Sequence, residues 1–420
     1  MKQRLAVVAG AISLALLIVC GIEVFNQASY GRGGKESTAN VQGPAKEIAF
    51  VSNAVDGTVT LIDIAGQQQV GLIDIKPDGA QVGFLRDPLQ WLGQAIIERR
   101  GGLNYAQDSD LSRDGQVLFV SRGFLADVAA FDIATGEVLW RTPIAGFRAD
   151  HMTIAPDGRR LYVSATIYGG NSVEVLDTTT GDKLGSFVAG QWPHDVHTTQ
   201  DGKHIYTASL GNMQKPLRER GLDEDAYTVT VVDSQSLTTV RRYAFEAGVR
   251  PFQVTGNEAT LYAQLSNTHS LIAHDLLTDS RIARLDLPVA AGVSETDWDF
   301  EAPHHGLALS PDEATLCVAG RASDYAGLVT TTDMRVAALV EVGNAPSWSV
   351  FDSSGEVCLL ANTRSDDVSL VSIREQRELA RIAAGRAPKH ITVGWVPESV
   401  LASTSEGRLE WHCLKQKCAN

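Results

Sequence analysis

Short runs in which apolar and polar residues alternate recur along most of the chain. The clearest copy reads APHHGLALSPD, from Ala302 to Asp312: an apolar run followed by turn residues. Six further copies have the same pattern: LNYAQDSDLSRDG, FRADHMTIAPDG, QWPHDVHTTQDG, VRPFQVTGNEAT, NAPSWSVFDSSG and APKHITVGWVPE. They are spaced by about 42 residues, a period typical of propellers and solenoids.

Each copy predicts four consecutive β-strands. An Asp-Gly or Pro-Asp-Gly turn separates the first apolar run from a β-branched run such as RRLYVSA, and this turn is a strong hairpin signal because Gly tolerates positive φ. Two further alternating runs follow, for example SVEVLDT and LGSFVAG, again separated by turn residues. Each repeat is therefore expected to form a four-stranded meander.

A four-stranded meander cannot bury both faces alone, and radial stacking of such sheets solves this problem. The sequence thus predicts an all-β fold, a β-propeller of four-stranded blades. Counting candidate strands, with an incomplete first and last repeat, favours eight blades; seven is the alternative. We expect closure by pairing of Gly34 to Pro44 with an end blade. The PDG and YVS elements of the repeat resemble those of YVTN-type propellers from Glu47 to Trp411.

The N-terminus differs from the repeats. Basic residues in Met1 to Arg4 precede the apolar stretch Leu5 to Val19, so residues 1–25 are predicted to be a signal peptide or an N-terminal membrane anchor, and LIVCG resembles a lipobox. Residues 26–45, rich in Gly, Ser, Asn and Gln, are predicted to be a flexible linker. Residues 46–420 are then one propeller domain, periplasmic or otherwise extracytoplasmic and in contact with a membrane only through its N-terminal segment.

Charge and cysteine content narrow the choice of partners. A net charge of −14 argues against nucleic acid, which leaves a small-molecule ligand or a periplasmic protein. Cys317 and Cys358 fall in apolar strand runs and are expected to be free buried thiols, whereas Cys413 and Cys418 are a candidate disulfide. No Cys-x-x-Cys-His is present, which excludes covalent c-type haem on this chain.

Three insertions interrupt the repeat, and loops on a rigid scaffold often carry function. Gly79 to Leu103 contains apolar residues at helical spacing and predicts a short helix over one mouth of the channel. Gly211 to Ala226 is highly charged and is expected to be a solvated loop. Val289 to Ala302 places several acidic residues and Trp298 directly before a pair of histidines.

One position of the repeat carries the candidate chemistry. It lies where the chain crosses from the outer strand of one blade to the inner strand of the next, so it should face the central channel. Aligned on the turn, its occupants are Gln107, His151, His194, Phe252, His305, Ser347 and Lys389. Only 10 of the 420 residues are His, so three in seven is an enrichment, and His304 precedes one of them.

Histidines gathered around a channel suit two kinds of chemistry. Neutral imidazoles bind copper or zinc, and His151, His194, His304 and His305 are the predicted metal ligands, with copper as the candidate cofactor. They can also hold an anionic ligand or transfer protons. A purely structural role, in which they bond nearby carbonyls, remains open. Side chains predicted to contact a ligand are Arg148, Trp192, Trp298, Asp299, Glu301 and Lys389.

Three propeller families resemble parts of this pattern. The His304–His305 doublet, with His151 and His194, is similar to the ligand set of copper-dependent methanethiol oxidases of the selenium-binding protein family. The expected blade number and exported location resemble the haem d1 domain of periplasmic nitrite reductases, which implies that channel histidines face a haem. Lactonase propellers combine a His, an Arg and a carboxylate, which His194, Arg148 and Glu301 would supply here.

Three functions therefore remain open. The first is an exported, copper-binding propeller with oxidoreductase activity at its histidine-lined channel. The second is a periplasmic protein that binds haem or another small ligand without turnover, and the third is an interaction scaffold. The sequence contains no P-loop, dinucleotide-binding fingerprint or serine-hydrolase motif, which argues against nucleotide and nicotinamide enzymes.

Overall fold

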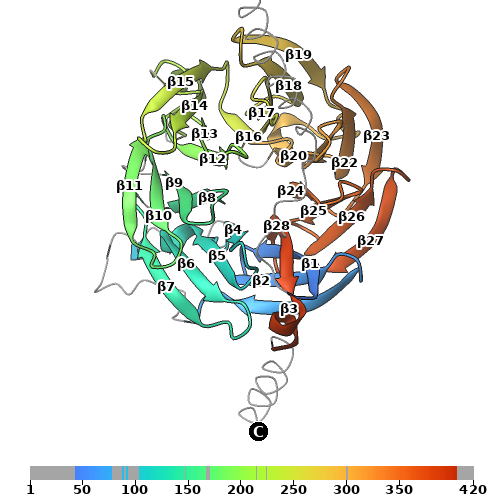
Figure 1. Ribbon diagram of the computed structural model, residues 1–420. Coiled ribbons are helices and arrows are strands. Elements are labelled where there is room, and N and C mark those ends of the chain that lie inside the picture. Colours follow the sequence, from blue (N-terminus) through green and yellow to red (C-terminus); the bar gives the residue numbers. More distant parts are fainter. Residues whose placement is uncertain are drawn as a thin grey trace, which may run out of the picture.

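Seven four-stranded antiparallel sheets surround a central axis like the blades of a propeller (Figure 1). The computed structural model describes residues 43–77, 88, 91–92, 104–146, 148–166, 171–213, 215–223, 225–298 and 301–403. The predicted all-β propeller of four-stranded blades is confirmed, because every sheet contains four strands in simple meander order. The prediction of eight blades is wrong, and the alternative of seven is correct.

In each of six blades the strands follow the chain from the axis outward, and the seventh combines both ends of the described chain. The blades are β28 (Pro388–Pro397), β1 (Ala45–Asn53), β2 (Thr58–Asp63) and β3 (Gln68–Asp74); β4 (Asp108–Leu111), β5 (Val117–Arg122), β6 (Asp127–Asp132) and β7 (Val138–Pro143); β8 (Arg148–Ile154), β9 (Arg160–Thr166), β10 (Ser172–Asp177) and β11 (Lys183–Val188); β12 (Pro193–Thr198), β13 (His204–Ser209), β14 (Thr228–Asp233) and β15 (Thr239–Ala244); β16 (Val249–Val254), β17 (Thr260–Leu265), β18 (Ser270–Asp275) and β19 (Ser280–Asp286); β20 (Leu307–Leu309), β21 (Thr315–Gly320), β22 (Tyr325–Thr330) and β23 (Arg335–Glu341); and β24 (Pro346–Phe351), β25 (Val357–Asn362), β26 (Asp367–Ser372) and β27 (Arg377–Ala383).

Pairing of the last strand with the first explains the miscounted blade. β28 lies antiparallel to β1 from Ala45↔Pro397 to Asn53↔Pro388, so it supplies the inner strand of the first blade (Figure 1). The incomplete first and last repeats are therefore two parts of one blade. The predicted strand near Leu401 is helical instead, and the expected closing segment Gly34 to Pro44 lies mostly outside the described residues. Pairing with β28 covers the inner edge of β1, and β28 becomes the strand nearest the axis in this blade, as the first strand is in the others.

The expected tight turns connect the first and second strands of the blades. Gly115, Gly158, Gly202 and Gly355 have φ between +69° and +74°, a conformation that Gly adopts without steric cost. In two blades Glu258 and Glu313 occupy this position, at φ +55° and +59°. The turn geometry is thus a property of the repeat, even where the Gly that signals it is missing.

The hydrophobic core is divided among the contacts between neighbouring blades. Seven clusters of buried apolar residues occur in the described chain, each shared by two adjacent sheets. In one of them Cys317 of β21 and Cys358 of β25 form a disulfide between adjacent blades. The expectation of two free thiols is therefore wrong: Cys317 is the third residue of β21 and Cys358 the second of β25, and this offset of one residue turns the two side chains toward one another across the blade contact. Cys413 and Cys418 lie outside the described residues.

The second and third insertions contact one another. The second contains helix α3 (Leu217–Arg220) and the third the short helix η3 (Glu295–Asp297), while η2 (Gly123–Leu125) follows β5. Arg220 is only 8% exposed, and its Nη1 lies 2.7 Å from Oε2 of Glu301. The second insertion is therefore not simply a solvated loop. Most of the first insertion, with its predicted helix, lies outside the described residues.

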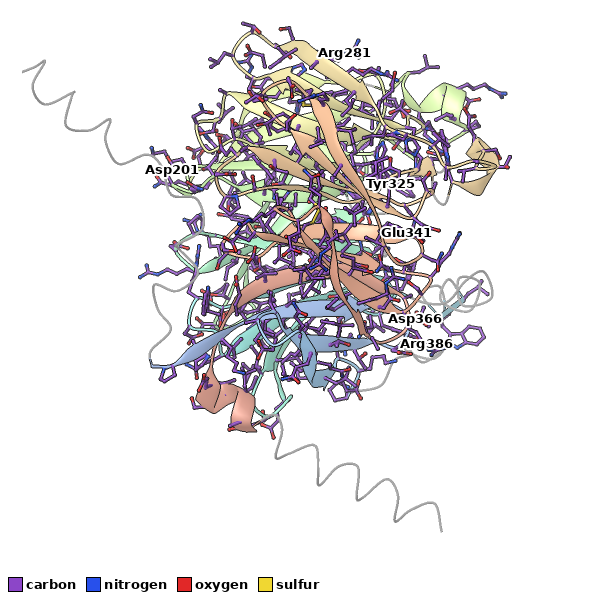
Figure 2. The ribbon with its side chains drawn as sticks, turned by 90° about the vertical axis from the view of Figure 1, so that its right-hand side faces the viewer. Asp201, Arg281, Tyr325, Glu341, Asp366 and Arg386 are labelled. Atoms are coloured by element: carbon purple, nitrogen blue, oxygen red, sulfur yellow. A yellow bond between two sulfur atoms is a disulfide. The ribbon has the colours of Figure 1, made fainter. Side chains whose placement is uncertain are left out.

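Charged side chains are exposed at several places on the surface of the propeller. In the side view, Arg281 and Asp201 lie near the periphery, and Asp366 and Arg386 lie close together (Figure 2). Oδ1 of Asp366 accepts a hydrogen bond from the backbone of Ala387, next to Arg386.

No helix within the described part of the chain is long and apolar enough to cross a membrane. The predicted signal or anchor (1–25) and all but the end of the linker (26–45) fall outside that part.

Candidate metal centre

Two successive residues near the start of each inner strand form two rings around the channel; Gln107, His305 and Gly306 lie directly before their strands. Strand pairing places them at equivalent positions in all seven blades. The first ring comprises Gln107, Asp150, His194, Arg250, His305, Ser347 and Lys389, and the second ring comprises Asp108, His151, Asp195, Pro251, Gly306, Trp348 and His390. The sequence alignment placed His151 and Phe252 at the same position as Gln107 and His194. In the structure Asp150 and Arg250 occupy that position, so His151 lies one residue and Phe252 two residues further along the chain.

A β-bulge explains why two consecutive side chains can serve the channel. The pairing register shifts at this point in five inner strands: β8, β12, β16, β24 and β28. A bulge inserts one extra residue and redirects its side chain, and bulges are common beside active sites. The repeat thus produces two rings of inward positions, where a regular strand would alternate.

Three of the four predicted ligands meet in the channel. Nε2 of His194 lies 3.4 Å from Nε2 of His305, and the ring of His151 lies 4.7 Å from that of His194. All three residues are at least 92% buried. Two nitrogens bound to one tetrahedral metal ion at about 2.0–2.1 Å are about 3.3–3.4 Å apart. The distance between the Nε2 atoms of His194 and His305 matches this nitrogen–nitrogen separation, and it is too long for a good hydrogen bond.

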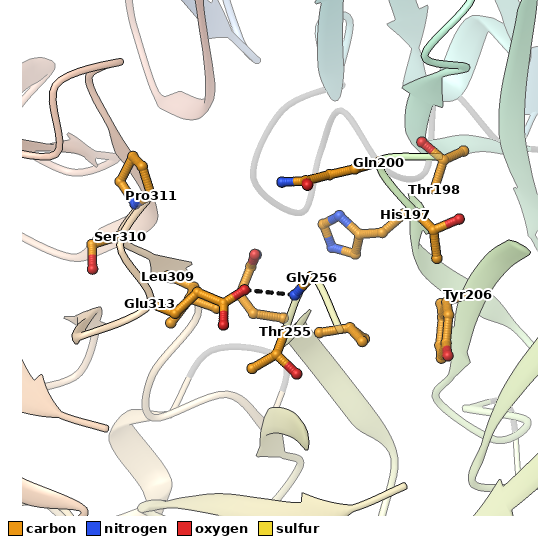
Figure 3. Close-up of a pocket in the computed structure, with 13 residues that line it drawn as sticks. His197, Thr198, Gln200, Tyr206, Thr255, Gly256, Leu309, Ser310, Pro311 and Glu313 are labelled. Carbon is orange, nitrogen blue, oxygen red and sulfur yellow. Dashed lines mark hydrogen bonds between the residues drawn. The ribbon is translucent and has the colours of Figure 1, made fainter. Parts of the chain in front are cut away.

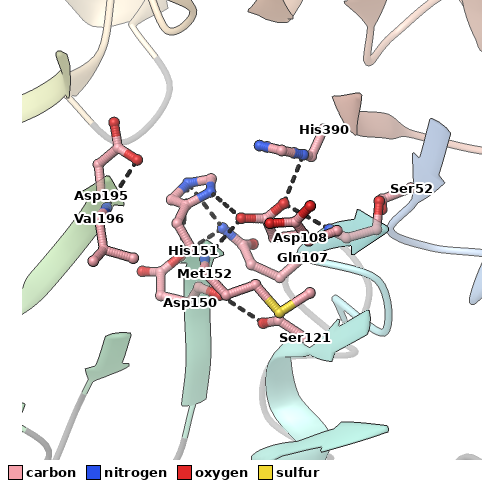
Figure 4. A network of polar contacts seen from close by, with 12 residues as sticks. Ser52, Gln107, Asp108, Ser121, Asp150, His151, Met152, Asp195, Val196 and His390 are labelled. Atoms are coloured by element: carbon pink, nitrogen blue, oxygen red, sulfur yellow. Dashed lines mark hydrogen bonds and ion pairs between the residues drawn. The ribbon is translucent and has the colours of Figure 1, made fainter. Parts of the chain in front are cut away.

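Carbonyl and carboxylate groups orient two of these imidazoles. Nδ1 of His305 lies 2.9 Å from the backbone oxygen of Ser347, and Nδ1 of His151 lies 3.2 Å from Oδ2 of Asp108 (Figure 4). Each Nδ1 donates its proton there, which leaves the lone pair of Nε2 available as a metal ligand. Nδ1 of His194 has no hydrogen-bond partner among the described residues.

Asp108 and Asp150 complete two groups that have metal-binding composition. Asp150, His151 and His194 each offer one ligand atom, all within 4.8 Å of one another, and the same is true of Asp108, His151 and His390. In the second group, Oδ1 of Asp108 is 2.7 Å from Nδ1 of His390, so these two atoms pair directly and leave no room for an ion between them. The first group has more space, because Oδ1 of Asp150 is 3.9 Å from Nε2 of His151. The better centre therefore combines His151, His194, His305 and Asp150.

Burial keeps two of these histidines neutral. It lowers the pKa of His194 well below its usual value, helped by the charge of His151, and it lowers that of His305, helped by Arg250. For His151, burial favours the neutral form, but the hydrogen bond to Asp108 and the charges of Asp150, Asp108 and Asp195 together raise the pKa. For Asp108, the charges and hydrogen bonds of His390 and His151 outweigh burial and lower the pKa. A metal would displace a proton mainly from His151.

Basic side chains lie beside the first ring. Nη2 of Arg148 donates to Oε1 of Gln107 at 3.0 Å and to Oδ1 of Asp150 at 3.3 Å. Burial and the charge of Arg148 lower the pKa of Lys389 to about 7. The predicted ligand-contacting residues Arg148 and Lys389 therefore do lie at the channel, together with Arg250 of the same ring.

The other predicted site residues lie elsewhere or outside the described residues. His304 is fully buried against His269, with ring centroids 5.7 Å apart, and contributes to neither metal group. Trp298 contacts the same His269 ring at 6.4 Å, and Glu301 pairs with Arg220. Trp192 is half-buried at a turn with φ +56°. Asp299 lies outside the described residues.

Sequence reasoning missed the acidic members of both rings. Asp108 and Asp150 were not candidates, and neither was Asp195, which lies 3.0 Å from Nε2 of His197. Trp348 stacks on His151 with centroids 4.7 Å apart and contacts His390 at 4.0 Å. In the six blades that have the positive-φ turn, the first-ring residue lies eight residues before the turn position and the second-ring residue lies seven residues before it. Counting back from the turn would therefore have found these residues in the sequence.

Two cavities share part of their lining, and the larger one reaches the second ring. The larger, of about 470 Å³, is lined by Asp108, Asp195, Trp348 and His390 among others. The smaller, of about 240 Å³, shares His197, Gln253, Leu309 and Pro311 with it (Figure 3). Oε1 of Glu313 accepts a hydrogen bond from the backbone of Gly256 across the smaller cavity. The second ring is thus reached through the larger cavity.

Seven blades, two rings of channel residues and a buried histidine cluster define a closed β-propeller with a polar channel site. The family model described as "Lactonase, 7-bladed beta-propeller" matches residues 109–395, more than half of the chain. The chain therefore belongs to this lactonase family of seven-bladed propellers. No curated protein sequence matches it.

Among solved structures, the chain is similar to hydrazine synthase of Kuenenia stuttgartiensis. The two share 17% sequence identity with a TM-score of 0.58, over 77% of this chain and 91% of that one. At this identity the similarity shows a common fold and no more. The matches thus establish a propeller family, while the resemblances to methanethiol oxidases and haem d1 domains stay predictions.

Proposed function

We propose that the channel holds one metal ion, copper, on His151, His194, His305 and Asp150, and that the protein is an oxidoreductase. The observation that carries this proposal is the approach of two neutral, buried Nε2 atoms to 3.4 Å. Buried polar atoms normally find hydrogen-bond partners, and an ion between these nitrogens would satisfy both. Asp150 would add one negative charge to offset that of the cation.

The donor set favours copper over harder metals. Three imidazoles and one carboxylate suit copper or zinc, whereas calcium and magnesium prefer oxygen ligands. When bound, copper would supply one-electron chemistry. The protein's own contribution would be to orient the ligands: Asp108 and the Ser347 carbonyl hold the two imidazoles, and Trp348 packs against one of them.

Elemental analysis tests this proposal. The full chain is produced with its own N-terminus in copper-supplied bacteria, purified without chelators and analysed by mass spectrometry of metals together with its optical spectrum. We expect about one copper per chain, reduced to about a tenth or less in His194→Ala and His305→Ala. The control is His204→Ala, which removes an imidazole that is bonded to Glu258 at the start of β13 and belongs to neither ring.

Other results would overturn specific parts of the proposal. Stoichiometric zinc that depends on the same histidines would support the metal centre but would contradict the proposed oxidoreductase activity. An intense haem band would favour haem binding instead. Absence of any metal in the wild-type protein, or equal metal content in all three variants, would contradict the metal centre itself and leave a metal-free pocket or a scaffold.

The family match favours hydrolysis of a lactone ring as a second candidate function. Glu301 is engaged by Arg220, so Asp150 replaces it beside His194 and Arg148. The carboxylate of Asp150 or a neutral imidazole can accept a proton from the attacking water, and the guanidinium of Arg148 can stabilise the oxyanion.

A pH-stat assay with γ- and δ-lactones tests this second candidate, using metal-loaded and chelator-treated protein. We expect hydrolysis to fall at least a hundredfold in Asp150→Asn and in Arg148→Met. The Glu301→Gln variant is the matched control and should retain the wild-type rate. Lactone hydrolysis no faster than the uncatalysed rate in both forms of the protein would rule this function out.

We also propose that the domain is exported and works in an oxidising compartment. The Cys317–Cys358 disulfide supports this, because such bonds persist mainly outside the cytosol. The basic and apolar residues at the start of the sequence support it independently. Fractionation of cells that produce the full chain should place it with periplasmic or membrane-anchored markers, and recovery with cytosolic markers would contradict export.

A further inference from the structure

Lys389 is a lysine at a position of the first ring, where the inner strand β28 bulges. The pairing register shifts at this point: Pro388 pairs with Asn53 and His390 with Ser52, which leaves Lys389 as the extra residue of the bulge. A bulge redirects the side chain of its extra residue out of the regular alternation of the strand. The fold therefore holds this amine at the channel rather than on an outer face of the blade.

No carboxylate forms an ion pair with Lys389 in the part of the chain that the structure describes. Asp150 is the one acidic member of the first ring, and its ion pairs are with Arg148 and His151. The side-chain amide of Asn104 lies 3.1 Å from Nζ of Lys389, so an uncharged group is the neighbour of the amine. A lysine that serves only the fold normally stays in water or pairs with an opposite charge.

Guanidinium groups flank Lys389 on both sides of the ring. The inner strands that contact β28 are β4 and β24, and the first-ring residues of their blades are Gln107 and Ser347. Nη2 of Arg148 donates to Oε1 of Gln107 at 3.0 Å, and Nη1 of Arg321 donates to Oγ of Ser347. Positive charge therefore lies on either side of the amine.

The surroundings of Lys389 favour its neutral form. Burial lowers its pKa to about 7, together with the charges of three arginines and against the opposing charge of Asp150. The arginines are Arg148, Arg321 and Arg250. About half of the protein then carries a neutral amine at neutral pH, whereas an ordinary lysine, with a pKa of about 10.4, is almost fully protonated. A desolvated lysine beside other cations is a nucleophile toward carbonyl carbon.

Arg148 gives a separate indication of a ligand. Its Nη2 atom bonds to Gln107 and Asp150, but its Nε atom is buried and has no hydrogen-bond partner among the described residues. Buried polar groups normally have a partner, so this guanidinium has bonding capacity left for an anion. Lys389 is half-buried and the Arg148 side chain is 22% exposed, so a small solute can reach both.

We infer that Lys389 forms an imine with a small 2-oxo acid. Its nitrogen attacks the keto carbon, a C–N bond forms, and the keto oxygen leaves as water with the two protons of the amine. Arg148 holds the carboxylate, and Arg321 adds positive charge on the other side of Lys389. A carboxylate attached directly to the carbonyl carbon matches cations placed beside the amine. The step needs neither a metal nor an oxidant, so it goes beyond both the copper centre and lactone hydrolysis.

Reductive trapping tests the inference on the full chain after chelator treatment. Pyruvate is added at neutral pH with cyanoborohydride, which reduces an imine to a stable secondary amine, and mass spectrometry of peptides locates the adduct. We expect about one adduct per chain, on Lys389, formed at least about tenfold faster than on any other amine. Hydroxyacetone, a ketone of similar size without a carboxylate, should label Lys389 at least about tenfold more slowly than pyruvate.

Two variants and a matched control assign the roles. Lys389→Arg keeps the positive charge and should lose the fast adduct. Arg148→Met should slow labelling by pyruvate about tenfold or more, and labelling by hydroxyacetone to a smaller extent, because only pyruvate has a carboxylate to bind. The control is Lys203→Arg, which removes an exposed amine paired with Asp201 and should be labelled at the wild-type rate.

Several results would overturn the inference. It is wrong if pyruvate labels Lys389 no faster than the exposed lysines, if pyruvate and hydroxyacetone react at equal rates, or if Lys389→Arg retains the fast adduct. Saturable binding of pyruvate without a trapped adduct would contradict the covalent step. Peptide mapping of the wild-type protein decides the matter even where a variant misfolds, and prior removal of metal separates the outcome from the copper proposal.

Discussion

His304 and His305 are adjacent in the chain but lie in different surroundings. His305 belongs to the first ring, with its Nδ1 bonded to the Ser347 carbonyl and its Nε2 directed at His194. His304 faces the opposite way and packs against His269, and neither of its ring nitrogens has a hydrogen-bond partner among the described residues. Two identical side chains thus differ because extended backbone directs consecutive residues to opposite sides.

This contrast shows what makes a buried histidine a candidate ligand. Burial is the main cause of a lowered pKa in both cases, to about 3 for His304 and well below the usual value for His305. Only His305 has a second imidazole at metal-bridging distance and a carbonyl that fixes its tautomer. Convergence of lone pairs, rather than burial, therefore separates a candidate metal site from a desolvated side chain.

The largest expected effect concerns the disulfide beside His305. It joins the same two blades that the His305–Ser347 hydrogen bond joins. A double Cys317→Ser/Cys358→Ser variant should lose about 4 kcal/mol of unfolding free energy, by the loop-entropy estimate for this sequence separation. Denaturant unfolding with and without reductant measures the loss. Equal stability of variant and wild type would show that the bond does not form.

The second effect should distinguish the two acidic neighbours in the second ring. Asp108→Asn removes the carboxylate that orients His151 and should weaken copper binding about tenfold to a hundredfold. Asp195→Asn is the control, because Asp195 contacts His197, which is not a proposed ligand. Competition with a chromophoric chelator gives both affinities. Similar losses in both variants would assign the effect to net charge rather than orientation.

The third effect isolates His304 through pH. Its folded pKa of about 3 lies below the usual 6.5, so the unfolded chain binds more protons and stability falls as the pH falls below about 6.5. Between pH 7 and 5 this residue should account for a loss of about 2 kcal/mol. A His304→Leu variant should show a pH dependence smaller by that amount in urea unfolding. An unchanged pH dependence would mean that His304 titrates normally.

The smallest effect concerns the segment that leads into both histidines. Glu301 lies three residues before His304 and is paired with the mostly buried Arg220. A Glu301→Gln variant should lose about 1 kcal/mol of stability, because the pair is partly exposed to solvent. Metal content should not change, since Glu301 is in neither metal group. Loss of bound copper in this variant would connect the insertion to the centre.

Much of the fold followed from local patterns. The turn signal before each β-branched run, and the alternation in all strands, predicted four-stranded blades because hairpin pairing depends on neighbouring residues. The number of blades did not follow, because β28 pairs with β1 across more than 300 residues and no local pattern marks that contact. The disulfide was missed for the same reason: Cys317 and Cys358 meet only when two blades stack.

The candidate site was predictable in part. Enrichment of His at blade starts found His151, His194 and His305, which the structure brings together. The assignment of His304 as a ligand is not supported, because its side chain points away from the rings. Asp108 and Asp150 escaped notice; in β8 a bulge of one residue lets Asp150 serve the channel beside His151, and no local pattern marks it.

By itself, the amino-acid sequence determined the repeated unit, its turns and the richness of its inner strands in histidine, because these depend on local conformational preference and composition. Only the tertiary structure decided how many blades close the ring and which side chains share the channel. Those properties arise from contacts between residues in different blades, and ring closure alone brings such residues together.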